Sequence, residues 1–298
     1  MPAVLASASG DFTSVFVSAS DGLQLHARCI GPTRTSALPV ICLPGLTRTA
    51  SDFDVLASAL AGGERPRRVV SIDYRGRGRS DYDRNPANYS PPVEMADVIT
   101  VLNALEALPA IFVGTSRGGI LTMLLAAARP GTVSAAVLND IGPVIEVQGL
   151  LRIKSYVGHL PQPKDFSDAA AILRRLFVAQ FPALTDADWH ASARRAFKEH
   201  EGRLVPTYDA ALARTLDGVA PDMPAPMLWA QFDALAGVPA MVIRGALSDL
   251  LSPQTIEAMR QRHPALKVVE VPDQGHAPLL TDANTIAQVC AFIATIGG

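Results

Sequence analysis

Residues 110–128 read AIFVGTSRGGILTMLLAAA, and this stretch decides the fold. The apolar run 110–113 predicts a buried strand, and residues 118–128 predict a strongly apolar helix. Between them stands G-x-S-x-G, which requires this order of strand, sharp turn and helix. Glycine at 114 and 118 avoids clashes with neighbouring backbone. We interpret Ser116 as a nucleophile at a helix N-terminus; the alternative is a turn that serves packing alone.

Short apolar runs alternate with helical patterns outward from this stretch, which is typical of an α/β fold with a mostly parallel central sheet and helices on both faces. An early β-rich part is expected around a turn at residues 19–22. Helices are expected at 51–60, with Ser51 as N-cap, at 93–108, from Pro253 and at the end of the chain. Strands are predicted at 14–17, 23–29, 39–43, 68–72, 110–113, 135–138, 239–243 and 267–271.

The alternation stops between residues 141 and 229. Amphipathic stretches separated by prolines replace it, with helices expected at 169–180, 186–200 and 208–216. We therefore predict two domains. A core formed by residues 1–140 and 230–298 carries an inserted helical cap at residues 141–229.

A general base and an acid are expected after later strands, because carboxyl ends of parallel strands meet at one edge of a sheet. His276 follows the strand at 267–271 and would take the proton of Ser116. Asp249 follows the strand at 239–243 and would orient the imidazole, which gives the order Ser116, Asp249, His276. A rival acid, Asp140, also ends a strand. We favour Asp249.

An acyl-transfer site also needs two donors for the oxyanion. The expected donors are the backbone amides of Arg117 and of Leu46, in the loop after the strand at 39–43. The alternative for that loop is an ordinary Pro-Gly turn. The side chain of Arg117 has two interpretations: it binds a substrate carboxylate, or an internal acid such as Asp140 neutralises it.

Composition restricts the function classes. With 49% hydrophobic and 18% charged residues, a large core is expected, and the net charge of −2 does not favour nucleic acid. The three cysteines form no CxxC pair, so neither a metal site nor a cofactor is predicted. No stretch is long and apolar enough for a membrane span, and no signal peptide is expected. The sequence thus favours a cytoplasmic protein with a small-molecule substrate, as monomer or homodimer.

These motifs together resemble the α/β-hydrolase superfamily along nearly the whole chain. Residues 73–80, DYRGRGRS, resemble the D-x-R-G-x-G-x-S segment of the subgroup with helical caps, and we interpret them as scaffold. The G-x-S-x-G turn of this family is called the nucleophile elbow. Dehalogenases and epoxide hydrolases have Asp there in place of the serine, so Ser116 disfavours these activities. The resemblance implies that the cap roofs the site. Its apolar residues either line a pocket or simply hold the cap helices onto the core. The substrate-binding candidates are Trp189 and Trp229, and the other residues of this kind are Tyr156, Leu160, Phe166, Phe177, Phe181 and Phe197.

The leading functional hypothesis is a carboxylic ester hydrolase that uses a Ser-His-Asp triad and an acyl-enzyme. The resemblance leaves two alternatives open. One is a carbon–carbon bond hydrolase or lactonase with the same triad, which Arg117 slightly favours because such substrates carry carboxylates. The other is a non-catalytic scaffold of this fold that binds a ligand.

Overall fold

A computed structural model describes residues 11–297 of the chain. Its central sheet has eight strands in the order β1-β2-β4-β3-β5-β6-β9-β10. β2 pairs antiparallel with β1 and β4, and the other neighbouring pairs are parallel, so the predicted mostly parallel sheet is confirmed. The prediction that no signal peptide is present concerns residues outside the described range. The strands are β1 (Thr13–Ser18), β2 (Gln24–Ile30), β3 (Val40–Leu43), β4 (Val69–Asp73), β5 (Ala110–Thr115), β6 (Val133–Asn139), β9 (Ala240–Gly245) and β10 (Lys267–Val271).

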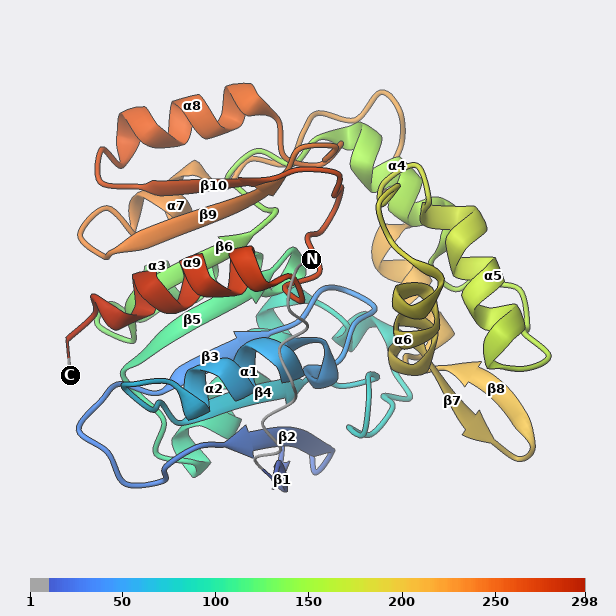
Figure 1. Ribbon diagram of the computed structural model, residues 1–298, viewed down its shortest axis with the longest axis horizontal. Coiled ribbons are helices and arrows are strands. Elements are labelled where there is room, and N and C mark those ends of the chain that lie inside the picture. Colours follow the sequence, from blue (N-terminus) through green and yellow to red (C-terminus); the bar gives the residue numbers. More distant parts are fainter. Residues whose placement is uncertain (1–10, 298) are drawn as a thin grey trace.

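Helices cover both faces of this sheet (Figure 1). On one face, α1 (Asp54–Gly62) and α9 (Ala283–Ala294) enclose one apolar cluster. A larger cluster fills the other face, beneath α2 (Pro91–Ala104), α3 (Arg117–Ala128), α7 (Trp229–Asp233) and α8 (Pro253–Arg262). The central strands are buried on both sides, which explains why they read as continuous apolar runs.

The start of the first helix differs from the prediction. A 3₁₀ turn, η1 (Ala50–Phe53), precedes α1, which begins at Asp54, so Ser51 is not its N-cap. The reason lies outside the local pattern. The carboxylate of Asp73, at the end of β4, accepts the backbone N–H of Ala50 at 2.7 Å and fixes the tighter turn.

The segment between β6 and α7 lies beyond the end of the sheet at which β6 ends (Figure 1). It is helical, as predicted, but the helix expected at 186–200 ends at Ala196. The chain then pairs with itself in a short hairpin, because Glu201 and Gly202 form its turn with positive φ. The prediction of two domains remains a prediction. The elements of this segment are α4 (Val147–Tyr156), α5 (Phe166–Phe177), α6 (Asp186–Ala196), β7 (Phe197–His200), β8 (Arg203–Pro206) and η3 (Ala210–Leu216). Another 3₁₀ turn, η2 (Pro86–Asn88), lies between β4 and α2 and has no buried residue.

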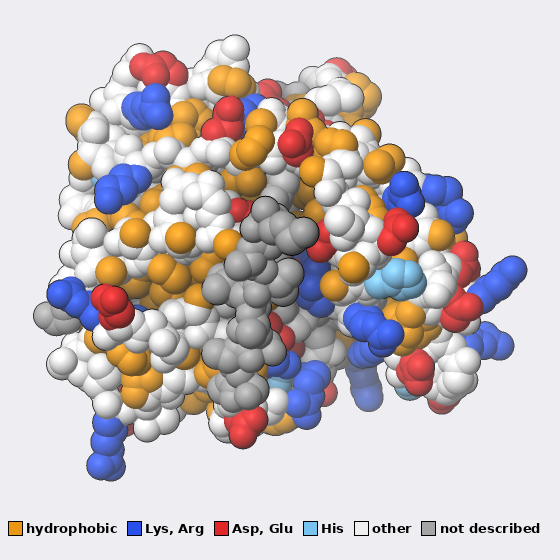
Figure 2. Space-filling model, viewed as in Figure 1, with side chains coloured by type: hydrophobic (Ala, Val, Ile, Leu, Met, Phe, Trp, Pro, Cys, Tyr) orange, Lys and Arg blue, Asp and Glu red, His pale blue; other side chains and the backbone are white. Residues whose placement is uncertain are grey.

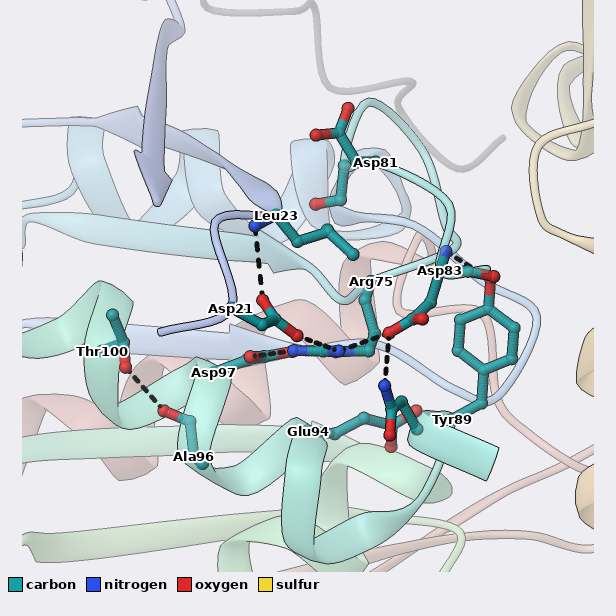
Figure 3. Close-up of polar contacts among 12 residues, drawn as sticks. Asp21, Leu23, Arg75, Asp81, Asp83, Tyr89, Glu94, Ala96, Asp97 and Thr100 are labelled. Atoms are coloured by element: carbon teal, nitrogen blue, oxygen red, sulfur yellow. Dashed lines mark hydrogen bonds and ion pairs between the residues drawn. The ribbon is translucent and has the colours of Figure 1, made fainter. Parts of the chain in front are cut away.

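The loop after β4 is held together by Arg75, as Figure 3 shows. Its buried guanidinium donates to Asp97 at 2.6 and 2.7 Å, to Asp21 at 2.9 Å and to Asp83 at 2.5 Å. These contacts join the loop to α2 and to the turn between β1 and β2. Three carboxylates around one buried cation favour the interpretation of residues 73–80 as scaffold.

Charged side chains of both signs lie interspersed on the face of the molecule seen in Figure 2. Within residues 11–297 no helix is long and apolar enough to cross a membrane. The same residues contain no group of three His, Cys, Asp or Glu side chains that could hold a metal ion.

Candidate active site

Ser116 occupies the sharp turn between β5 and α3 that the motif predicts. Its φ and ψ of 50° and −109° are unusual for a residue with a side chain, and they mark backbone strain at this turn. A Cβ on Gly118 would lie 2.0 Å from the carbonyl oxygen of Leu43, and one on Gly114 would lie 2.5 Å from the backbone of Gly118. Both glycines are therefore required for the helix to leave the strand so closely.

His276 lies in the loop after β10, with its ring against the elbow. Its Nε2 atom is 2.9 Å from Oγ of Ser116. Its backbone N–H donates to Oε1 of Gln180 at 2.9 Å, and Gln180 follows α5 in the inserted segment. The structure thus brings the predicted base to the predicted nucleophile, and it ties the loop of the base to the inserted segment.

The acid that contacts His276 is Asp140, the residue directly after β6. Nδ1 of His276 lies 2.8 Å from Oδ2 of Asp140, which is fully buried. The hydroxyl of Ser248 donates to the same oxygen at 2.6 Å, and the N–H of Gly245 donates to Oδ1 at 2.8 Å. Asp140 has φ of 54°, so its backbone is strained like that of Ser116. The hydrogen bonds from Ser248 and Gly245 hold the carboxylate in position against the imidazole.

The predicted contact between Asp249 and His276 is wrong. Asp249 instead faces Arg152 of α4, whose Nε and Nη2 donate to its two oxygens at 2.5 and 2.8 Å. Burial would raise the pKa of Asp249, but the hydrogen bonds and charge of Arg152 outweigh it and lower that pKa. The turn after β9 directs Ser248, rather than Asp249, toward Asp140.

The two predicted oxyanion donors flank the elbow. Arg117 is the first residue of α3, and Leu46 lines the pocket in the loop after β3. Within residues 11–297, neither backbone amide donates to another group of the protein. Two unused amides beside the nucleophile are what an acyl-transfer site needs.

The Arg117 side chain does not enter the pocket. Its Nε donates to Oε2 of Glu94 at 2.7 Å, and Glu94 also meets Arg77 at 2.8 Å. Burial would raise the pKa of the Glu94 carboxyl, but the two guanidiniums lower it. Neutralisation by an internal acid is therefore the correct interpretation, with Glu94 in place of Asp140, and the predicted substrate contact is wrong.

A pocket opens above Ser116 and His276, walled mainly by the inserted segment. Trp189 lines it as predicted. Trp229 does not: it packs edge-on against Phe232 and lies under the guanidinium of Arg262. Phe166 and Phe197 belong to the internal cluster of the segment instead. The apolar and aromatic side chains at the wall include Tyr156, Leu160, Phe177, Phe181, Trp189 and Tyr208.

Sequence reasoning missed Ser248 and Gln180, which hold the acid and the loop of the base, and Arg48, the one cationic guanidinium among the described lining residues. Ser248 is the residue before the predicted acid, Asp249. The expectation of a functional side chain after β9 therefore missed it by one position. Gln180 and Arg48 lie in segments without a motif, and their contacts arise only from the tertiary fold.

Comparisons with known proteins identify the family. Residues 40–289 match the alpha/beta hydrolase family, and the chain belongs to it. It is 36% identical to a 3-hydroxybutyrate-oligomer hydrolase of Cupriavidus necator, over 83% of this chain and 85% of that protein. It is 27% identical to a 2-(acetamidomethylene)succinate hydrolase of Mesorhizobium japonicum, over 78% of this chain and 79% of that protein. A crystal structure of an alpha/beta hydrolase from Novosphingobium aromaticivorans is 38% identical and superimposes with a TM-score of 0.89, covering 96% and 99% of the two chains. At the level of class, the protein is a hydrolase of this family, and its relatives include ester hydrolases.

Proposed function

We propose that the protein is a serine hydrolase of carboxylic esters, with Ser116 as nucleophile, His276 as base and Asp140 as the acid that orients the base. The observation that carries the proposal is the continuous chain of hydrogen bonds from Oγ of Ser116 through His276 to Asp140, at 2.9 and 2.8 Å. This arrangement lets the imidazole accept the serine proton while the carboxylate stabilises the cation that forms.

In the first half-reaction, Oγ of Ser116 attacks the ester carbonyl carbon and its proton passes to Nε2 of His276. The carbonyl oxygen becomes an oxyanion, which the amides of Leu46 and Arg117 stabilise. The carbon–oxygen bond to the alcohol then breaks. The alcohol leaves with the proton of His276, and an acyl group remains on Ser116.

In the second half-reaction, water replaces the alcohol. His276 takes a proton from water, whose oxygen attacks the acyl carbon, and the same two amides stabilise the second oxyanion. Collapse of this intermediate releases the carboxylic acid, and His276 returns the proton to Ser116. Every step uses groups of this chain.

The substrate class follows from the pocket and from similarity. The wall is mostly apolar and aromatic, which suits short acyl chains. The relative with 36% identity over most of both chains is named for an oligomer of 3-hydroxybutyrate. We therefore propose short aliphatic esters, including oligoesters of hydroxy acids, as substrates of this protein.

Labelling with a fluorophosphonate probe and turnover of p-nitrophenyl butyrate test the proposal. Wild type should be labelled and active, and Ser116→Ala and His276→Ala should lose both properties. Ser155→Ala is the matched control, because Ser155 is an exposed serine on α4 that bonds only the Arg152 carbonyl. A folded wild type that neither labels nor turns over would contradict the proposal and favour the non-catalytic scaffold.

A further inference from the structure

One wall of the pocket is charged, although the rest is mostly apolar. Arg48 and Asp52 line the pocket, and they follow Leu46 in the loop after β3 and in η1. A Cβ built on Gly45 would lie 3.4 Å from Cγ of Arg48 and 3.8 Å from Cβ of Ser116. The stem of Arg48 therefore starts beside the nucleophile.

Two guanidiniums share the single carboxylate of Asp52. Arg48 donates to it through Nε and Nη2 at 2.6 and 2.8 Å, and Nε of Arg195, on α6, lies 3.6 Å from the same carboxylate. Burial lowers the pKa of Arg195, and the positive charge of Arg48 lowers it further, although Asp52, Asp54 and Asp188 oppose this shift. Burial would also lower the pKa of Arg48, but Asp52 outweighs it and raises that pKa, so Asp52 is mainly the partner of Arg48. We call these three residues the Arg48 cluster.

Nearby acids do not remove the excess charge. Asp54 is paired with its own cation, Arg28, at 3.0 Å. Asp188 accepts a hydrogen bond from the backbone N–H of Thr185, the N-cap of α6, and is exposed to water. Nη1 of Arg48 makes no hydrogen bond within residues 11–297, and the side chain keeps 33% of its surface exposed. Arg48 thus presents an unused donor at the pocket wall, and the cluster as a whole, with Arg195 behind that wall, carries a net positive charge.

We propose that the Arg48 cluster binds a carboxylate of the substrate, so that the enzyme prefers short esters that carry a free acid group near the ester bond. Asp52 occupies the fork formed by Nε and Nη2 of Arg48, so Nη1 is the donor that would form a charge-assisted hydrogen bond with the substrate carboxylate. This inference rests on the proposed ester hydrolase function. It adds the recognition of a charge, which the triad alone does not require.

Binding to the Ser116→Ala variant tests the inference separately from catalysis. Isothermal titration would compare the linear dimer of 3-hydroxybutyrate with its methyl ester, which keeps the same ester bond but lacks the negative charge. The acid should bind about tenfold more tightly than the methyl ester, since hydrogen bonds to charged groups are the stronger ones. If the Ser116→Ala variant shows this preference but wild type turns over no ester, the result would count against the proposed function and not against the binding of the carboxylate.

Three further variants in the Ser116→Ala background sharpen the test. Arg48→Gln and Arg195→Gln should each reduce the preference for the acid to near onefold. The one remaining guanidinium is then neutralised by Asp52, and the cluster has no net positive charge. Asp52→Asn should raise it above that of the parent, an increase that a merely structural role of the cluster would not produce. Arg174→Gln is the control, because Arg174 forms an exposed ion pair with Asp186 on the same segment and does not line the pocket.

Two results would overturn the inference. One is equal or undetectable binding of acid and methyl ester to the Ser116→Ala protein. The other is a preference for the acid that both Arg48→Gln and Arg195→Gln retain, because the charge would then be recognised elsewhere. Circular dichroism and thermal unfolding of each variant establish that it is folded before its affinities are compared.

Discussion

His276 and Asp140 are joined by a hydrogen bond of 2.8 Å, and the other strand-end acid, Asp249, is held by Arg152 instead. The two acids thus have different partners: Asp140 contacts the imidazole of His276, and Asp249 joins α4 to the segment after β9.

Replacing each of the two acids with asparagine should distinguish their roles. We expect Asp140→Asn to lower kcat by about 10³–10⁴-fold, because an amide no longer selects the required tautomer of His276 or stabilises the imidazolium. Asp249→Asn should lower it by less than about tenfold and should mainly weaken the ion pair with Arg152. Steady-state kinetics with p-nitrophenyl butyrate measures both. A larger loss in Asp249→Asn than in Asp140→Asn would reverse the assignment.

The sequence alone could not decide which of Asp140 and Asp249 contacts His276. The turn at Ser116, the approach of His276 to it and the positions of the sheet strands along the chain could be predicted, because buried strands, an apolar helix and glycines are local signals. Asp140 and Asp249 carry a similar local signal, an acid in the segment that follows a buried strand. The choice depends on the turn after β9, which aims Ser248 inward, and on Arg152, which comes from a helix that the sequence pattern did not predict.

Ser248 should act as a positioning residue for the acid. Its hydroxyl donates to the same Oδ2 of Asp140 that receives Nδ1 of His276. Ser248→Ala removes that donor, and we expect kcat to fall about tenfold with little change in KM, the loss corresponding to one hydrogen bond to a charged group. Ser248→Thr keeps a hydroxyl and should recover most of the rate. Equal losses in both variants would contradict this role.

Trp189 and Trp229 form a matched pair, since the sequence suggested both for the pocket and the structure places only Trp189 there. The helical pattern of the inserted segment could not reveal how it packs on the core. Trp189→Phe should change the ratio of kcat/KM values for p-nitrophenyl acetate and hexanoate by up to about tenfold, since one methylene already alters binding in an apolar pocket. Trp229→Phe should leave that ratio unchanged. The prediction fails when both variants shift the ratio equally.

The buried pair of Arg117 and Glu94 should contribute to stability. Arg117→Gln leaves Glu94 with only Arg77, and we expect the free energy of unfolding to fall by about 2 kcal/mol, because a buried charge is then less well compensated. The double variant Glu94→Gln, Arg117→Gln should lose less than the sum of the two single variants. Urea unfolding followed by fluorescence measures all three. Additive losses would mean that the two side chains do not stabilise each other.

Asp54 gives the stability of the protein a defined pH dependence. Burial raises the pKa of its carboxyl from 3.8 to about 6, although the charge of Arg28 opposes the shift. Between about pH 4 and pH 6 the folded protein therefore holds a proton that the unfolded chain releases, so stability falls as pH rises through this window. Because the side chain is 37% exposed, solvent screening limits the effect to about 1 kcal/mol.

Asp54→Asn removes the titrating group and tests this sign. Relative to wild type, the variant should gain stability progressively from pH 4 to pH 6, and the difference should then stay constant to pH 8. A constant offset from the lost contact with Arg28 does not affect the test, because the measured quantity is the change of the difference with pH. Ser155→Ala is the control, since it removes no titratable group. A difference between wild type and Asp54→Asn that is flat from pH 4 to pH 6 would show that the Asp54 carboxyl titrates alike in the folded and unfolded chain.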